Sequence, residues 1–290
     1  MQYLSRNSKQ ECHKAASMTR GAILFVAVGA IAVLSILALG ATSSVMQELK
    51  LAKFVTETDT SPYLAQSCVD IMKVLLSNDA TPQAVTLYDL REREIPIGDK
   101  TLLIVPIDEQ SKINLDLAPK EILGRVAGLS GQTQLIDAVF GANIAVREEL
   151  LLLDGMTQEV YDQLKGLTTV FGLGLVNINT AQPGAFSAQG MDPDLIKKIQ
   201  EYRAGDDGTE ATEDDRYFSN SSEIITQLMS YGITPAQQQV IQGLLSTMQL
   251  GVTTDYVSFD ITVLQGKKRV SFFKITADLA KATIVFWHEE

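Results

Sequence analysis

The chain of 290 residues is acidic, because 24 lysine and arginine residues face 35 aspartate and glutamate residues and give a formal net charge of −11. It has two histidines and two cysteines, and Cys12 and Cys68 lie on opposite sides of a long apolar segment. This composition excludes a His-based catalytic triad and a multi-histidine zinc site, disfavours nucleic-acid binding, and predicts no intrachain disulfide.

The apolar segment lies near the N-terminus, where residues 21–47 carry no charged side chain. Roughly 20 such residues cross a bilayer core as a helix. Four basic residues and one acidic residue precede it, namely Arg6, Lys9, Lys14, Arg20 and Glu11. This positive excess predicts a cytoplasmic N-terminus and an exported body. A cleaved secretory signal ending near residues 38–40 is the alternative, although its apolar region would be longer than the usual stretch of about 7–15 residues.

Beyond the anchor the helical pattern continues, because Val45, Leu49 and Ala52 recur at i, i+4 and i+7. This spacing places them on one helix face, and we expect that face to pack against partner helices. A second amphipathic helix is predicted over residues 63–76, with an apolar stripe of Leu64, Cys68, Ile71, Met72 and Leu75.

Strand-like segments flank the middle of the chain. Two precede it, at residues 84–88 and 101–107, and three follow it, at 256–264, 269–277 and 282–287. The last three alternate apolar and polar side chains around turns, which predicts an antiparallel meander. The sequence therefore predicts an α+β fold in which a small sheet carries a large helical insert.

The insert contains an internal repeat. The segment beginning Ile113-Asn114 resembles the segment beginning Ile178-Asn179, and each half later contains a Gly-apolar-Thr turn, at Gly155 and at Gly232. The two asparagine-to-glycine spacings are 41 and 53 residues, and the longer one contains an acidic loop, residues 205–215. A glycine ending one helix and a threonine capping the next predict a helix–hairpin–helix arrangement in both halves. We interpret Asn114 and residues 177–180 as structural caps of these helices.

The acidic loop concentrates carboxylates without a lysine or an arginine. Hard oxygen ligands of this kind suit calcium, which takes about 6–8 of them. The spacing is not that of an EF-hand, and the alternative is a solvated flexible loop. The candidate calcium ligands are Asp206, Asp207, Glu213, Asp214 and Asp215.

Several blocks together resemble a known family. They are Arg20-Gly21 before the apolar helix, residues 108–116, residues 149–157 with Tyr161 and Leu164, residues 177–181 with Ile199 and Tyr202-Arg203, Phe218 with Glu223, and the closing strand that ends in residues 287–289. In this order they resemble minor pseudopilin K of type II secretion, the general secretion pathway protein K family. The resemblance covers nearly the whole chain.

The resemblance implies a pilin-like α+β fold: a long N-terminal helix packed on a small antiparallel sheet, with an all-helical insert of helix–hairpin–helix type. It implies a leader at 1–21, a transmembrane spine helix at 22–58, an α/β body at 59–112 and 251–290, and two related helical units at 113–250. It also implies a non-enzymatic protein of the inner membrane with its body in the periplasm.

The resemblance further implies processing. Prepilin peptidase would cut after Gly21, and the new amine of Ala22 would be methylated. Most pilin-like proteins have glutamate at the fifth mature position, where this chain has Val26. A subunit with nothing above it needs no such carboxylate, which implies a place at the pseudopilus tip with minor pseudopilins I and J, and also H.

A second function is an anchored DNA receptor of the competence type, because the segment from Asn177 to Gly232 also resembles the helix–hairpin–helix domain of those receptors. The tips at 153–159 and 230–236 contain no basic residue. Acidic side chains beside phosphates are repulsive. The sequence therefore favours the assembly function, with no nucleic acid among the partners.

Overall fold

The computed structural model describes residues 28–52, 60–77 and 85–290. The chain forms two compact units, Met1–Thr60 and Ser61–Glu290, and each is described by itself. In the first unit the structure shows one helix, Val28–Ala52, of 25 residues. The continuation of this helix toward residue 58, which the sequence predicts, lies outside the described residues.

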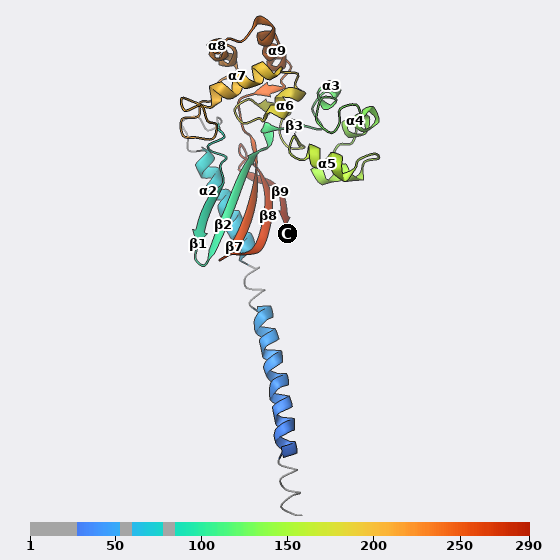
Figure 1. Ribbon diagram of the computed structural model, residues 1–290, viewed down its shortest axis with the longest axis vertical. Helices are drawn as coiled ribbons and strands as arrows, with labels where there is room; N and C mark the ends of the chain where they lie inside the picture. Colours follow the sequence, from blue (N-terminus) through green and yellow to red (C-terminus); the bar gives the residue numbers. More distant parts are fainter. Residues whose placement is uncertain (1–27, 53–59, 78–84) are drawn as a thin grey trace, which may run out of the picture. The chain divides into compact units, whose positions relative to one another are not determined.

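The second unit contains a five-stranded antiparallel sheet (Figure 1), with strand order β1-β2-β7-β8-β9. The β1–β2 and β7–β8 connections are two residues long and begin with Gly98 and Gly266, whose positive φ angles of 63° and 61° suit such hairpins. The predicted meander and the strand over residues 101–107 are confirmed. The strand bounds are β1 Arg93–Ile97, β2 Lys100–Asp108, β7 Tyr256–Gln265, β8 Lys268–Asp278 and β9 Thr283–Glu289.

Helix α2, Ser61–Ser77, packs on one face of this sheet, mainly against β8 and β7. Its buried side chains contact alternate side chains of the strands, whose period of two directs them to the same face. The predicted helix is thus confirmed. The core between them consists of Ala65, Cys68, Val69, Met72 and Leu76 of α2 with Leu102, Ile104, Phe259, Ile261, Phe273 and Ile275 of the sheet.

Two sequence predictions in this region are wrong. The apolar stripe of α2 is rotated from the predicted one, because Ile71 and Leu75 are 40% and 42% exposed whereas Ala65 and Val69 are buried. Apolar residues of α2 lie on more than one face of the helix, so their periodicity alone does not identify the buried face. The segment after residue 84 is a turn and not a strand, since the Asp89 carboxylate accepts hydrogen bonds from the backbone N–H and hydroxyl of Thr86 at 2.9 and 2.8 Å.

The chain between β2 and β7 forms a helical lobe, residues 109–255, which opens with a short 3₁₀ helix, η1 (Glu109–Ser111). It contains two similar halves (Figure 1). The first half contains β3 Ile113–Asn114, α3 Lys120–Leu123, α4 Thr133–Phe140, η2 Arg147–Leu152, α5 Gln158–Leu164 and β4 Thr168–Thr169. The second contains β5 Val176–Asn177, α6 Pro183–Ala188, α7 Pro193–Arg203, η3 Ser221–Glu223, α8 Ile224–Met229, α9 Pro235–Ser246 and β6 Leu250–Gly251.

Each half is closed by a parallel pair of short strands, β3 with β4 and β5 with β6. The equivalent first asparagines are Asn114 and Asn177, because their carbonyls accept the N–H groups of Ala118 and Ala181 at 3.0 and 2.9 Å. The repeat is therefore present, but its predicted register, which matched Asn114 with Asn179, is wrong by two residues. The doublet of asparagines at 177 and 179 made either register compatible with the sequence.

Candidate functional site

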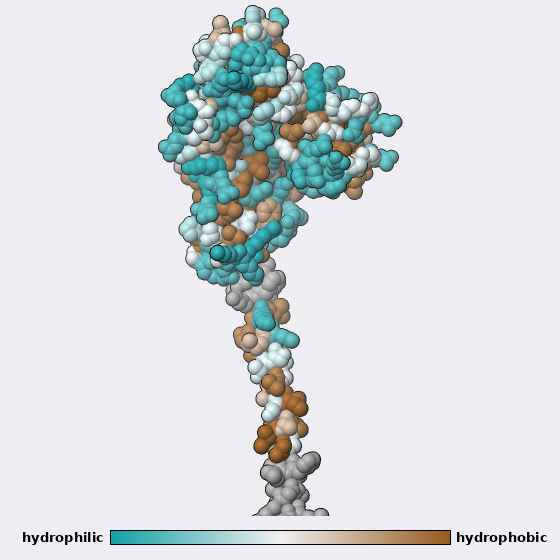
Figure 2. All heavy atoms as spheres, in the orientation of Figure 1, coloured by the Kyte–Doolittle hydropathy of each residue, from teal (hydrophilic) through white to brown (hydrophobic). Residues whose placement is uncertain are grey.

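The N-terminal helix is apolar from Val28 to Ala41 except at Ser35, and it carries charged side chains only at Glu48 and Lys50. It is the one helix among the described residues that is long and apolar enough to span a membrane. At about 1.5 Å per residue its 25 residues exceed a hydrocarbon core of about 30 Å. Three of its hydroxyl groups, those of Ser35, Thr42 and Ser44, donate to carbonyls one turn earlier, as Ser35 does to Ile31 at 2.8 Å, so these three need no partner in lipid. Figure 2 shows apolar side chains along much of this helix.

The predicted partner-binding face lies on this helix. Val45 and Leu49 are 53% and 60% exposed within the described chain, and Ala52 is the last residue of this helix that the structure describes. A partner contact through these residues remains a prediction. The predicted processing residues Gly21 and Ala22, and Val26 at the fifth mature position, lie outside the described residues.

A cluster of buried polar side chains joins the helical lobe to the sheet. Asp108, the last residue of β2, is 1% exposed. Its Oδ2 accepts hydrogen bonds from Asn177 Nδ2 at 2.9 Å, Thr180 Oγ1 at 2.5 Å and Thr254 Oγ1 at 2.8 Å. Its Oδ1 accepts the N–H of Gln110 at 2.9 Å. The Asp108 carboxylate therefore connects the end of β2, where the chain enters the lobe, to Thr254, where the chain returns to the sheet.

Burial raises the pKa of Asp108 to about 6, although the four hydrogen bonds to its carboxylate act in the opposite direction. Gln110 reinforces the same junction, since its amide donates to Asp255 Oδ2 at 2.9 Å and its oxygen accepts the N–H of Tyr256 at 3.1 Å. The strand entering the lobe and the strand leaving it are thus held together by side chains as well as by the sheet.

A second buried polar group anchors the acidic loop. Arg203 at the end of α7 is 3% exposed and donates to the carbonyls of Ile178 and Ala181 at 3.1 and 2.8 Å. Its Nε donates to Glu210 Oε1 at 2.7 Å. The desolvation of a buried guanidinium is offset only when it is paired in this way. Arg203 therefore ties the base of the loop to the second half of the lobe.

Two further carboxylates, those of Asp214 and Asp215, accept hydrogen bonds from within the loop. Asp214 Oδ2 accepts the N–H groups of Asp206 and Asp207 at 2.7 and 3.0 Å, and a hydrogen bond from Thr212 with these two holds the pKa of Asp214 down at about 2. Asp215 accepts the N–H of Ala211 at 2.9 Å.

The remaining contacts of these candidate ligands go to other side chains. Asp206 forms an ion pair with Arg216. Tyr88 donates to Glu213 Oε1 at 2.8 Å. Residues 85–290 and the other described residues bring no three acidic, histidine or cysteine side chains together as a metal site. In this arrangement the carboxylates serve as caps and ion-pair partners, and calcium binding stays a prediction.

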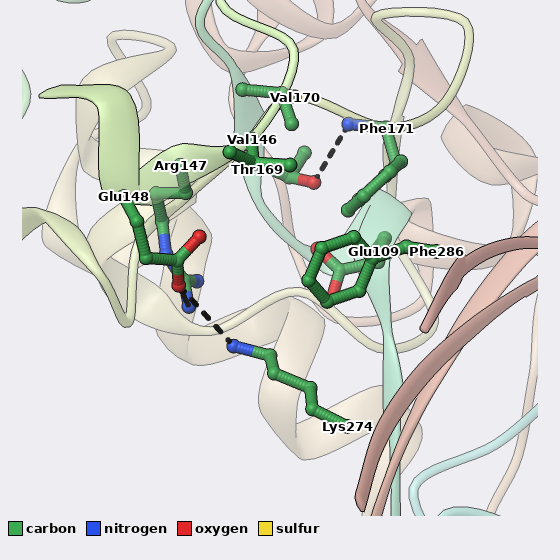
Figure 3. A pocket seen from close by; sticks show the side chains of 9 residues that line it. All are labelled: Glu109, Val146, Arg147, Glu148, Thr169, Val170, Phe171, Lys274 and Phe286. Carbon is green, nitrogen blue, oxygen red and sulfur yellow. Dashed lines mark hydrogen bonds and ion pairs between the residues drawn. The ribbon is translucent and has the colours of Figure 1, made fainter. Parts of the chain in front are cut away.

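Figure 3 shows a small pocket where η2 meets the sheet. Lys274 of β8 lies 4.0 Å from Glu148, and Phe286 of β9 packs beside Phe171 with ring centroids 6.0 Å apart. Burial and the neighbouring Arg147 lower the pKa of Lys274. The cavity measures about 20 Å³, far below the roughly 300–1,000 Å³ of small-molecule sites. It is a contact between lobe and sheet.

The two glycine turns have the predicted local geometry. Gly155 and Gly232 have φ angles of 85° and 73°. Thr157 caps α5 through the N–H of Val160, and Thr234 caps α9 in a capping box with Gln237. Such turns leave backbone N–H groups near the surface at a helix N-terminus.

A basic side chain from outside the sequence motif contacts the second glycine turn. Lys198 of α7 donates to the carbonyl of Gly232 at 2.9 Å and to Asp194 Oδ2 at 2.6 Å. Its charge is therefore paired with a carboxylate one helical turn earlier. This pairing does not favour phosphate contacts at the second turn.

The sequence did not reveal the Asp108 cluster, because its members lie 69, 72 and 146 residues apart from Asp108. Its one signal was the polar block that follows an apolar strand at 108–114. The interpretation of the asparagines as structural residues is confirmed, since Asn114 Oδ1 accepts the N–H groups of Asp116 and Leu117, and Asn177 Oδ1 accepts that of Asn179. They are not helix caps, because the N-cap residues of α3 and α6 are Pro119 and Gln182.

A long apolar N-terminal helix, a further helix on a small antiparallel sheet, and a helical region define a pilin-like fold. No family model and no curated protein matches the chain. Among solved structures it is similar to a chain of the crystal structure of the GspK–GspI–GspJ complex from the type 2 secretion system of enterotoxigenic Escherichia coli. The TM-score is 0.59 at 11% identity, and the alignment covers 84% of this chain and 99% of the other. This likeness shows the fold, which is that of a pseudopilin.

Proposed function

We propose that the protein is a minor pseudopilin of a type II secretion system, resembling pseudopilin K, which caps or nucleates the pseudopilus tip and supports protein export across the outer membrane. The observation that carries this proposal is the likeness of fold over nearly the full length of a chain from a complex of three such proteins. The single apolar helix supports membrane anchoring. The protein acts by assembly and catalyses no reaction.

The partners in this proposal are minor pseudopilins I and J, with H below them in the fibre. The helical lobe adds the residues 109–255 to one end of a small sheet, and a subunit of this width does not stack repeatedly in a thin fibre. Val26 supports the same position, because a tip subunit has no neighbour above it whose terminal amine would need a carboxylate.

Assembly is tested by co-expressing the full-length chain with subunits I and J of the same secretion system and measuring masses by size-exclusion chromatography with light scattering in detergent. We expect a 1:1:1 complex and no homopolymer. A monomer in the presence of both partners at micromolar concentration, or a homopolymer in their absence, would contradict the tip assignment.

Processing by prepilin peptidase is part of the proposal, with the N-terminus in the cytoplasm and the body in the periplasm. Mass spectrometry of the protein extracted from inner membranes should find a methylated N-terminus at Ala22. The variant Gly21→Asp should keep its leader, whereas Ala38→Asp near the alternative cleavage site should be processed normally. A mature N-terminus near residue 41 would indicate a secretory signal instead.

Calcium binding by the acidic loop is proposed as a stabilising feature. A ligand that binds the folded state raises the melting temperature by mass action, so calcium should raise it in a manner that chelator reverses. The triple variant Asp206→Ala/Asp207→Ala/Asp214→Ala should lose this shift, and Asp154→Ala/Glu159→Ala, which removes exposed carboxylates elsewhere in the lobe, should retain it. If calcium shifts the melting temperatures of both variants equally, the loop does not bind calcium.

The alternative, a DNA receptor of the competence type, remains open to a direct test. Fluorescence anisotropy with labelled duplex DNA at low and physiological salt should show no saturable binding by the full-length protein. Micromolar affinity that falls steeply with salt would favour the receptor instead.

A further inference from the structure

The sheet has two edges, and they differ in how they are protected. The strand order places β1 at one edge and β9 at the other (Figure 1). Along an edge strand, every second residue directs its N–H and C=O away from the sheet, where another strand can pair with them. Proteins usually block such edges with proline, charge or irregularity.

The β1 edge is blocked. This strand has five residues and contains Pro96, which has no N–H to donate. Glu94 and Pro96 are the exposed residues of β1 and pair with Leu103 and Thr101 of β2. Because they are two positions apart, their backbone groups point to the same side of the strand. A strand that approached β1 would meet a missing donor and a carboxylate.

The β9 edge has no proline, and its carboxylate, Glu289, is the last residue of the strand. Its seven residues, Thr-Ile-Val-Phe-Trp-His-Glu, contain no proline, lysine or arginine. Val285 and Trp287 are 45% and 37% exposed. β-branched and aromatic residues of this kind favour strand pairing. The one irregularity is a bulge between Phe286 and Ile284, which confines the regular edge to residues 286–290.

The direction of the backbone groups follows from the hydrogen bonds of the last residue. Glu290 exchanges two bonds with Phe272 of β8, at 2.8 and 3.0 Å, so its own N–H and C=O point inward. The alternation of an antiparallel ladder then points those of Glu289 and Trp287 outward. Within the described part of the chain, no strand pairs with this side of β9.

Charge distinguishes between two candidate binding partners of this edge, a second copy of the chain and a different subunit. Glu290 is paired with Arg269 at 3.4 Å, whereas Glu289 forms no ion pair with another described residue. The chain beyond residue 21 has 20 basic and 34 acidic residues, so a second copy brings a like charge toward an edge that ends in glutamate. A partner strand with a basic side chain is complementary to it.

We propose that the outer edge of β9, at residues 286–290, receives an extended strand from a pilin-like partner subunit, with a basic residue of that strand opposite Glu289 and an apolar one beside Trp287. This inference rests on the proposed function, because the partners are the pseudopilins of the tip complex. Backbone hydrogen bonds provide the affinity in this mode of binding, and side chains at alternate positions provide the specificity.

Proline substitution tests the backbone contact. Glu289→Pro removes an outward N–H without removing a bond to β8, and Glu94→Pro is the matched control at the outward side of β1. Both full-length variants should melt close to the unmodified protein. Affinity for co-purified subunits I and J should fall about tenfold, or about 1.4 kcal/mol, for Glu289→Pro and stay unchanged for Glu94→Pro. Glu289→Gln should weaken binding less, and chiefly at low salt.

Equal affinities for the two proline variants would overturn the inference while leaving the proposed function intact, and no complex with the unmodified protein would contradict both. Photo-crosslinking identifies the occupant. Benzoylphenylalanine at Val285 should crosslink to a strand of subunit I or J, and the same group at Glu94 should not. A crosslink from Val285 only to a second copy of the chain, or only to a partner helix, would also overturn the inference.

Discussion

The two halves of the helical lobe have the same plan but different attachments. In both, an asparagine at the end of a short strand accepts backbone N–H groups, Asn114 from Asp116 and Leu117, and Asn177 from Asn179. The amide donors differ. Asn114 donates to the carbonyl of Phe171 within its own half, at 3.0 Å, whereas Asn177 donates to Asp108 of the sheet. The two halves thus share the local turn at this asparagine, and only in the second half does the asparagine amide donate to the sheet.

The difference extends to the next polar position. Asp116 and Asn179 are equivalent, and their side chains accept the N–H groups of Ile144 and Phe218 at 3.2 and 2.8 Å. Only Asn179 is an amide, and it also donates to the carbonyls of Phe218 and Val252 at 3.1 Å. The second half therefore connects its own loop, its closing strand and the sheet, and we expect it to carry most of the stability of the lobe.

The largest expected effect compares the two asparagines. Asn177→Ala leaves a buried carboxylate with fewer donors and the N–H of Asn179 without an acceptor, which should cost about 3–5 kcal/mol of unfolding free energy. The matched variant Asn114→Ala loses only hydrogen bonds within its own half of the lobe and should cost about 2 kcal/mol. Urea denaturation of the detergent-solubilised protein, followed by the fluorescence of its single tryptophan, Trp287, measures both. Equal losses would show that the attachment to the sheet adds no stability.

A pH titration should reveal the charge at the same junction. The pKa of Asp108 is about 6 in the folded protein and is raised mainly by burial, so the folded state binds this proton more tightly than the unfolded state does. Lowering the pH from about 7 to about 4 should therefore stabilise the native protein relative to the Asp108→Asn variant, by up to about 3 kcal/mol. The measured quantity is the difference in unfolding free energy between the two proteins at each pH. A difference independent of pH would contradict the raised pKa.

The smallest expected effect compares the two helix caps. Thr234 forms a reciprocal capping box with Gln237, whereas Thr157 accepts a single N–H. Thr234→Ala should cost about 1.5 kcal/mol and Thr157→Ala about 0.5–1 kcal/mol. Thermal melts of the two variants, with Ser replacements as controls that keep the hydroxyl, would show the order. A larger loss at Thr157 would reverse the ranking of the two halves.

The sequence predicted those parts of the fold that depend on local periodicity. Alternating side chains in 256–287 specify β7, β8 and β9, and the glycine–threonine pairs specify the turns before α5 and α9. The segment after residue 84 was predicted as a strand because its composition is β-prone, and the Thr86–Asp89 turn overrides that preference. The hydrogen bonds of Asp108 could not be predicted, since many donors distant in the sequence are compatible with a buried carboxylate and local patterns do not identify the partner.

The attachment of the lobe has a consequence for the growth of such folds. Asp108 and Val257 are paired neighbours in β2 and β7, so these strands form a hairpin whose loop is 148 residues long. The entropy of closing a loop rises only with the logarithm of its length, and extending a four-residue turn to this length costs about 3 kcal/mol by that relation. A folded lobe recovers more than this from its own core. The connection between β2 and β7 can therefore accommodate a whole folded lobe without any change in the residue pairing of the two strands.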